Sequence, residues 1–368
     1  MALTKVSTGV VDMSGSTGAL EIAKGATTAV AAPLGTLRAN TTTNKMEVYA
    51  STGWRVLKEG GNAIVPPLTV DYLVVAGGGG GGSWTQTSNV GCGGGGGAGG
   101  LRSSWKPSGA GSGGSGGGCA SEATPTLATS TSYDVTVGSG GAGQPFNTST
   151  QNNGGDSEFN GIVSNGGGAG GSYIGVNANT GGSGGGAGYL GGGGGRINCQ
   201  GYLGGSFGSA GTPYRHGGGG GAASNGQTGG TSGAGGGGNG FASSITGIFP
   251  SPFYAGGGGG GVAYITTVSN GGSNIGGKGG NQIVNATNPT VNTGSGGGGA
   301  GKGTSATQTT PSAGADGVVI LRYPDVYQLN LTAGASPAFN STNAVVGTDT
   351  MVTTITAGSG TITFSLKP

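Results

Sequence analysis

The feature that most constrains this chain is a series of glycine runs, the longest of them without any other residue. The first run directly follows a short apolar stretch, in the sequence DYLVVAGGGGGGS of residues 71–83. Glycine makes up 98 of the 368 residues, and charged residues make up 7%. Because glycine has no side chain to bury and loses more conformational entropy on folding than any other residue, side-chain burial cannot order such a segment. Backbone hydrogen bonds are therefore expected to hold it together.

Two phosphate-binding motifs match glycine runs formally, but both lack the context that the chemistry needs. The first run fits GxGxxG, yet no helix-forming segment follows it and no Asp or Glu occurs between Asp71 and Glu122. Residues 272–278 and 296–302 fit GxxxxGK, yet glycine stands where a P-loop places the magnesium-binding serine or threonine. Flexible linkers also fit poorly, because aromatic and β-branched residues interrupt the runs.

A third interpretation is a packed lattice of extended helices made from glycine itself. A helix of the polyproline-II type has three residues per turn and no internal hydrogen bonds. Its N–H and C=O groups point outward, and neighbouring helices can pair with them where the backbones approach closely. Only glycine permits that approach on every face, so we expect all-glycine runs in the interior of the lattice. If successive helices alternate in direction, only every second loop reaches the same end.

Composition divides the chain into four segments and predicts the fold class. The segments are an N-terminal β module for assembly or attachment (1–60), a linker (61–70), a glycine-rich domain (71–324) and a C-terminal β cap or tip (325–368). In the first of them we expect a turn at Thr43-Asn44-Lys45 and a packing anchor at Trp54. The predicted fold is mostly β and irregular, with almost no α-helix. Short β-strands frame a lattice of polyglycine-II helices, and small β domains lie at both ends.

Other features of the sequence argue against catalysis and against several classes of partner. Cys92, Cys119 and Cys199 have the spacing of neither a disulfide framework nor a zinc site, and leave the oxidation state open. His216 is expected to be an ordinary loop residue, and no nucleophile or paired acids accompany it. We therefore expect no enzyme, no cofactor and no metal. A net charge of +2 disfavours nucleic acid, and we find no signal peptide and no transmembrane segment.

Aromatic residues in the loops between glycine runs are the best candidates for contacts with a partner. Flat rings with polar neighbours suit glycan-binding surfaces, and Tyr, Trp and Arg anchor protein interfaces. The loops 196–216 and 241–255 combine length with aromatic content. The predicted contact residues are Tyr202, Phe207, Tyr214, Arg215 and Tyr254. The alternative is that such rings only cap the ends of the lattice and shield its backbone edges.

The segment AKGATTAVAAPLGTLRANTTTNKMEVYASTGWRVL, residues 23–57, resembles a short module of bacteriophage tail and tail-fibre proteins. The pattern is a Gly-Thr-Thr start, a Pro, then G-x-L-R-x-N-T, E-x-Y and G-x-W. The matching residues are Gly25, Thr27, Thr28, Pro33, Gly35, Leu37, Arg38, Asn40, Thr41, Glu47, Tyr49, Gly53 and Trp54. The Arg-Pro pair of that family is replaced here by Ala32-Pro33.

Four further segments resemble the glycine-rich domain of phage tail fibres and adhesins, and occur in the order expected. They are DYLVVAGGGGGG, SYDVTVGSGGAG, GGDSEFNGIVSNGGGAGG and ADGVVILRYP. The resemblance implies β-strands at about 71–76, 132–137, 158–164 and 317–323, which frame the glycine runs.

The two resemblances together predict a non-enzymatic virion protein, a tail fibre or receptor-binding adhesin. They imply a homotrimer that is made in the host cytoplasm and joins other tail or virion proteins through its N-terminal module. Loops between glycine helices would contact a host surface glycan or outer-membrane protein. The alternative is a self-assembling structural filament or surface-layer protein.

Overall fold

The computed structural model describes most of the chain and divides it into two compact units, residues 1–66 and 67–368. The described residues are 24–25, 36–43, 45–50, 53–56, 65–83, 92–106, 114–172, 175–208, 214–230, 233–303, 309–334, 339–347 and 349–367. They are mostly strand and irregular backbone, and their helical segments are short 3-10 turns at Gly116–Gly118 and Gly272–Asn274. The predicted fold class, β and irregular with almost no α-helix, is confirmed.

The first unit contains a four-stranded sheet in the order β1-β2-β3-β4. Its strands are β1 (Lys24–Gly25), β2 (Leu37–Asn40), β3 (Lys45–Ala50) and β4 (Gly53–Val56). After β2 the chain turns, because the Asn40 side-chain oxygen accepts the N–H groups of Thr42 at 3.0 Å and Thr43 at 3.2 Å. The observed turn thus occupies 41–43 and overlaps the expected 43–45 only at Thr43, because Lys45 already begins β3; Asn44 is outside the described residues.

A buried charged pair organises this sheet. Arg38 and Glu47 are direct cross-strand partners, with 2.7 Å between Nε and Oε2, and both are buried. Asn40 donates to the other carboxylate oxygen at 3.0 Å, so the pair is satisfied. The guanidinium of Arg38 lies 4.1 Å from the Trp54 ring centre, and Tyr49 packs edge-on against that ring. Trp54 is thus a packing anchor, as predicted.

The second unit begins with two five-stranded sheets, in the orders β14-β15-β12-β5-β6 and β13-β16-β7-β8-β9. Their strands are β5 (Asp71–Val75), β6 (Leu101–Ser103), β7 (Tyr133–Thr136), β8 (Ser157–Phe159), β9 (Ile162–Ser164), β12 (Val318–Pro324), β13 (Tyr327–Ala333), β14 (Asn340–Val346), β15 (Thr350–Ala357) and β16 (Ser359–Leu366). Strands occur at all four predicted positions. The third is a hairpin rather than one strand, because Asn160 and Gly161 adopt positive φ and reverse the chain.

The two sheets pack face to face around an apolar core. Strand β5 contributes Tyr72 and Val74 to this core, where they meet Phe159 of β8 and Phe364 of β16. Its alternate residues point to the other face, which the hairpin of β10 (Phe241–Ala242) and β11 (Phe253–Tyr254) covers. Burial on both faces explains why β5 reads as a continuous apolar run. Residues after Pro324 supply strands to both sheets, so this segment shares one compact unit with the glycine-rich residues.

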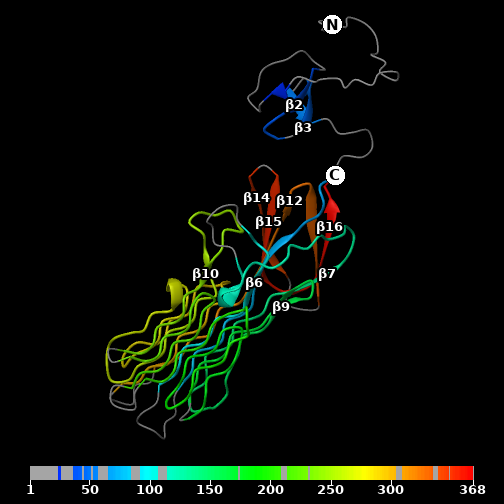
Figure 1. Cartoon of the computed structure of the whole chain (residues 1–368). Coiled ribbons are helices and arrows are strands. Elements are labelled where there is room, and N and C mark those ends of the chain that lie inside the picture. Colours follow the sequence, from blue (N-terminus) through cyan, green and yellow to red (C-terminus); the bar gives the residue numbers. More distant parts are fainter. Residues whose placement is uncertain are drawn as a thin grey trace, which may run out of the picture. The chain divides into compact units, whose positions relative to one another are not determined.

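The glycine runs extend from this β-sandwich as a bundle of parallel and antiparallel extended segments (Figure 1). In the run 77–82, successive N–H groups donate to three different neighbours, and the pattern repeats every third residue at 2.8 to 3.0 Å. The donors pair with segments 152–155, 312–315 and 94–97, and the carbonyls accept from 167–170, 141–144 and 297–300. A threefold helix with a neighbour on each of six sides is the predicted polyglycine-II arrangement.

Close approach between the backbones makes glycine obligatory at many positions inside this lattice, although alanine is buried at others, such as Ala98 and Ala187. A Cβ atom on Gly79 would lie 2.3 Å from the carbonyl oxygen of Gly168, and one on Gly96 would lie 2.1 Å from that of Gly79. Neither neighbour can move without breaking its own hydrogen bonds. Gly230 differs, because a Cβ atom there would meet nothing within 4 Å. Glycine is thus required by packing at some positions and not at others.

Successive extended segments alternate in direction, which divides the loops between two ends. Consecutive glycine runs need not alternate: 166–171 and 181–188 are parallel, because Gly182 N–H donates to Gly166 C=O and Gly171 N–H donates to Gly186 C=O. The run 77–82 leads away from β5, and the run 93–100 returns to β6, with Gly82 bonded to Gly94 and Gly79 to Gly97. Figure 1 shows the resulting bundle with one end at the sheets and the other at a set of loops. We call the latter the far end of the lattice.

We expect Gly96→Ala to destabilise the second unit by about 3 kcal/mol, because the added methyl group overlaps a backbone carbonyl. Gly230→Ala is the matched control and is expected to change stability by no more than about 0.5 kcal/mol. Urea unfolding followed by circular dichroism would measure both. Equal stability of the two variants would contradict the close packing of the lattice.

Candidate functional site

Four aromatic rings from three loops gather at the far end of the lattice. Tyr189 lies 5.2 Å from Phe207 and 5.3 Å from Tyr214 between ring centres, with both contacts edge-to-face. Tyr264 follows at 6.2 Å from Tyr214. All four side chains are half-buried, so each ring keeps part of its surface toward solvent. We call these four residues the aromatic cluster.

The lattice itself brings the cluster together. Tyr189 and Phe207 follow the runs 183–188 and 201–205, which are bonded through Ala187 N–H and Gly205 C=O at 2.8 Å. Tyr214 precedes a run whose Gly217 N–H donates to Ala187 C=O at 3.0 Å. Because neighbouring backbones are held at fixed spacing, the rings at their ends meet at ordinary aromatic contact distances. The cluster is therefore preorganised by hydrogen bonds far from its own side chains.

Tyr264 enters the cluster from the next run in the lattice. It follows the run 256–261, and the N–H of neighbouring Ala263 donates to the Tyr214 carbonyl at 3.2 Å. A short bridge between Arg215 and Val262 holds the same two loops together. The ends of separate runs are thus joined by their own backbones as well as by ring contacts.

His216 closes the lattice beneath the cluster, and the expectation that it is an ordinary loop residue is wrong. Gly219 N–H donates to Gly258 C=O in this antiparallel pair of runs. At the next repeat, three residues before Gly219 and three after Gly258, the His216 Nδ1 atom replaces the backbone donor and lies 3.1 Å from the Gly261 carbonyl oxygen. The side chain is fully buried and its ring centre lies 5.4 Å from that of Phe207. Burial lowers the pKa of His216 to about 4, so the imidazole is neutral at pH 7.

The structure brings together only part of the predicted contact set. Phe207 and Tyr214 belong to the cluster, and Arg215 is half-buried beside them. Tyr202 lies toward the sheets instead, two residues after Gln200, whose carbonyl accepts the N–H of Leu101 in β6.

Tyr254 is a correction to the predicted contact residues. It lies in β11 with 8% of its surface exposed, and it packs on the outer face of the first sheet. Burial raises the pKa of its hydroxyl to about 12. Its ring therefore stabilises the hairpin that covers the sheet and cannot be offered to a partner.

Sequence reasoning missed two members of the cluster, Tyr189 and Tyr264. The signal that could have found them is their position directly after a glycine run that leads to the far end. To use that signal, one must know whether each run leads away from the sheets or toward them. That in turn requires counting the reversals of chain direction before the run. The loop length on which the prediction relied favoured 241–255, which lies at the opposite end.

The cysteines also depart from the sequence analysis, which found no disulfide framework. Cys119 and Cys199 form a disulfide across 80 residues, with 5.2 Å between their Cα atoms. It joins the Gly116–Gly118 turn to the turn before Gln200, on the side of the lattice near the sheets. Cys92 is free and buried. The long separation and the odd number of cysteines hid this pairing from a reading based on spacing.

The described residues contain no cluster of three or more His, Cys, Asp or Glu side chains that could hold a metal ion. None of their helical segments has the length and apolarity to cross a membrane. The aromatic cluster offers contact by flat rings with polar edges. Tyr hydroxyls can add hydrogen bonds at the rim of such a surface.

Comparison with known proteins identifies the family of the chain. Residues 90–324 match the family model described as the glycine-rich domain, and this chain belongs to that family. The matched segment includes most runs of the lattice and all four members of the aromatic cluster. No curated protein and no solved structure is significantly similar to the chain.

Stability should fall in acid through His216. The unfolded histidine takes up a proton near its ordinary pKa of 6.5, whereas the buried one resists protonation until about pH 4. The unfolded state therefore binds more protons in this window, and the linkage costs about 3 kcal/mol between pH 7 and pH 4.

His216→Asn is the matched variant for this effect, because its amide can still donate to Gly261 C=O but does not titrate. Urea unfolding at pH 7, 5 and 4 should show a smaller acid-dependent loss in the variant than in the wild type. An identical loss in both proteins would mean that other groups cause the acid sensitivity.

Proposed function

We propose that this chain is a non-enzymatic structural protein of a bacteriophage virion, a tail fibre or adhesin that contacts a host surface. The aromatic cluster is the proposed contact surface, and a surface glycan or an outer-membrane protein is the proposed partner. The N-terminal unit would join other tail or virion proteins. The proposal draws on the sequence resemblance to phage tail modules as well as on the geometry of the second unit.

The observation that carries the proposal is the convergence of four aromatic rings at one end of a rigid lattice. A lattice held mainly by its backbone groups leaves many loop side chains free for another task. Rings held at fixed spacing lose little entropy on binding, which is the general advantage of a preorganised site. A half-buried aromatic surface with polar edges is also typical of binding hot spots.

Self-association into a homotrimer is part of the proposal. Each sheet ends in a seven-residue edge strand, β13 or β14, and neither strand carries a charged side chain or a proline. Edge strands of monomeric proteins are commonly protected by such residues, so these edges favour pairing with another copy. Three weak contact surfaces on one stiff particle would bind a cell more tightly than one through avidity.

A direct test is adsorption of the fluorescently labelled, folded chain to a panel of bacterial cells, measured by flow cytometry. We expect saturable binding to a subset of hosts and weaker binding by at least about tenfold for Tyr214→Ala, which removes two ring contacts of the cluster. Phe249→Ala is the control, because this residue is 94% exposed and lies in the 241–255 hairpin near the sheets.

Equal adsorption by both variants would move the contact away from the aromatic cluster. A folded oligomer that adsorbs to none of the cells would remove the adhesin proposal. Polymers of the same protein in electron micrographs would then favour the structural filament. Size-exclusion chromatography with light scattering would give the number of copies.

A further inference from the structure

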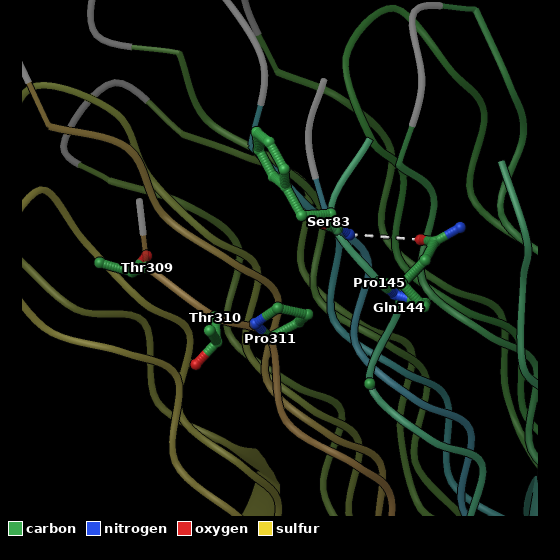
Figure 2. A pocket seen from close by; sticks show the side chains of 8 residues that line it. Ser83, Gln144, Pro145, Thr309, Thr310 and Pro311 are labelled. Carbon is green, nitrogen blue, oxygen red and sulfur yellow. Dashed lines mark hydrogen bonds between the residues drawn. The ribbon is translucent and has the colours of Figure 1, made fainter. Parts of the chain in front are cut away.

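A cavity of about 230 Å³ opens among the ends of two glycine runs and one other extended segment, at a place that the aromatic cluster does not use. Figure 2 shows two groups of residues facing each other across it, Ser83 with Gln144 and Pro145 on one side and Thr309 to Pro311 on the other. The lining residues are Ser83, Gly143, Gln144, Pro145, Phe146, Thr309, Thr310 and Pro311. They follow the runs 77–82 and 138–143 or precede the extended segment 312–315, so the cavity lies at the far end of the lattice.

Hydrogen bonds to the lattice fix the walls of this cavity. The Gln144 N–H donates to Gly81 C=O at 3.0 Å, and its side-chain oxygen accepts the Ser83 N–H at 3.2 Å. On the opposite wall the Thr309 hydroxyl donates to the Gly301 carbonyl at 2.8 Å and accepts the Gly301 N–H at 2.7 Å. The N–H of Thr310 is held by Asn285 at 2.9 Å. Both walls are therefore preorganised.

The chemistry of the lining is neutral and two-sided. None of the described residues that line the cavity is charged, which disfavours ionic ligands. Pro145, Phe146 and Pro311 supply flat apolar surfaces, and the exposed Thr310 supplies a hydroxyl. The Gln144 side-chain nitrogen has no hydrogen-bond partner among the described residues, although the residue is 3% exposed. This nitrogen is itself buried and in Figure 2 lies on the side of Gln144 away from Thr309 to Pro311, so Gln144 shapes the wall and does not offer a donor to the cavity.

We propose that this cavity binds one neutral sugar ring. A pyranose has a C–H face that packs on aromatic and proline surfaces and a rim of hydroxyl groups that both donate and accept hydrogen bonds. The cavity lies below the roughly 300–1,000 Å³ typical of sites for drug-sized ligands, which matches a single ring and not an oligosaccharide. This inference rests on the proposed function, because it assigns the chemical class of a host-surface ligand. The same ring chemistry also occurs in free sugars.

The experiment is saturation-transfer NMR on the full chain with the methyl glycosides of glucose, galactose and N-acetylglucosamine, and with N-acetylneuraminic acid as a charged comparison. We expect signal from at least one neutral glycoside and none from the acid. Phe146→Ala and Thr310→Val should each weaken binding by about tenfold, the first by removing the ring surface and the second by removing a hydroxyl at nearly constant shape. Phe249→Ala is the aromatic control and should bind as the wild type does.

Three results would overturn the inference. They are no neutral glycoside bound by the folded wild type, binding unchanged in both cavity variants, or equal binding of the charged sugar. Circular dichroism of each variant at the same time separates loss of the site from loss of the fold.

Competition by the bound glycoside in the cell-adsorption assay separates a cell-surface sugar from a free one. Inhibition supports a cell-surface source of the ring, and the absence of inhibition overturns that source. Adsorption to cells without any glycoside binding would leave the proposed function standing and remove only this site. Glycoside binding without adsorption to any cell would leave this site standing and remove the proposed function.

Discussion

Hydrogen bonds between extended glycine backbones are the interaction on which the second unit depends. Each contributes only about 1 kcal/mol net, so the lattice is stable only where nearly every N–H and C=O group has a partner. The threefold repeat meets that demand, because successive residues of the run 77–82 turn toward different neighbours. The condition for it is the absence of Cβ atoms, as the 2.1 Å approach at Gly96 makes plain.

The β-sandwich and the lattice are two parts of one hydrogen-bonded system. Strand β5 continues without a loop into the run 77–82, and β12 is entered directly from the segment 312–315. Strand β5, which is buried on both faces, fixes the start of the run 77–82 in space. The apolar core of the sheets therefore sets the alignment of the lattice. The lattice in turn sets the positions of the loops at its far end.

Much of this architecture could be predicted from sequence, because glycine leaves few alternatives. A run such as 77–82 cannot form a side-chain core, and the lack of a following helix excludes a phosphate loop. The strands could be predicted because their apolar runs are conspicuous among glycines. From sequence it could also be stated that, if successive helices alternate in direction, the loops are divided between two ends.

The identity of neighbours in the lattice could not be predicted, because all the runs look alike. His216 was therefore predicted to be a loop residue, although its side chain replaces a backbone N–H donor to the Gly261 carbonyl. Tyr254 passed as a contact residue, although its hairpin folds back over a sheet whose second apolar face needed a cover. Cys119 and Cys199 meet only because turns 80 residues apart belong to adjacent runs. In each case the missing information was long-range pairing between similar segments.

The all-backbone interior has a further consequence for the heat capacity of unfolding. Exposing apolar surface raises the heat capacity, whereas exposing peptide groups lowers it, and ordinary domains reach a net of about 12–15 cal/mol/K per residue. Unfolding this lattice releases mainly peptide groups, so its value per residue lies below that range. The free energy of unfolding then varies less steeply with temperature. Cooling weakens this interior less than it weakens an interior of apolar side chains.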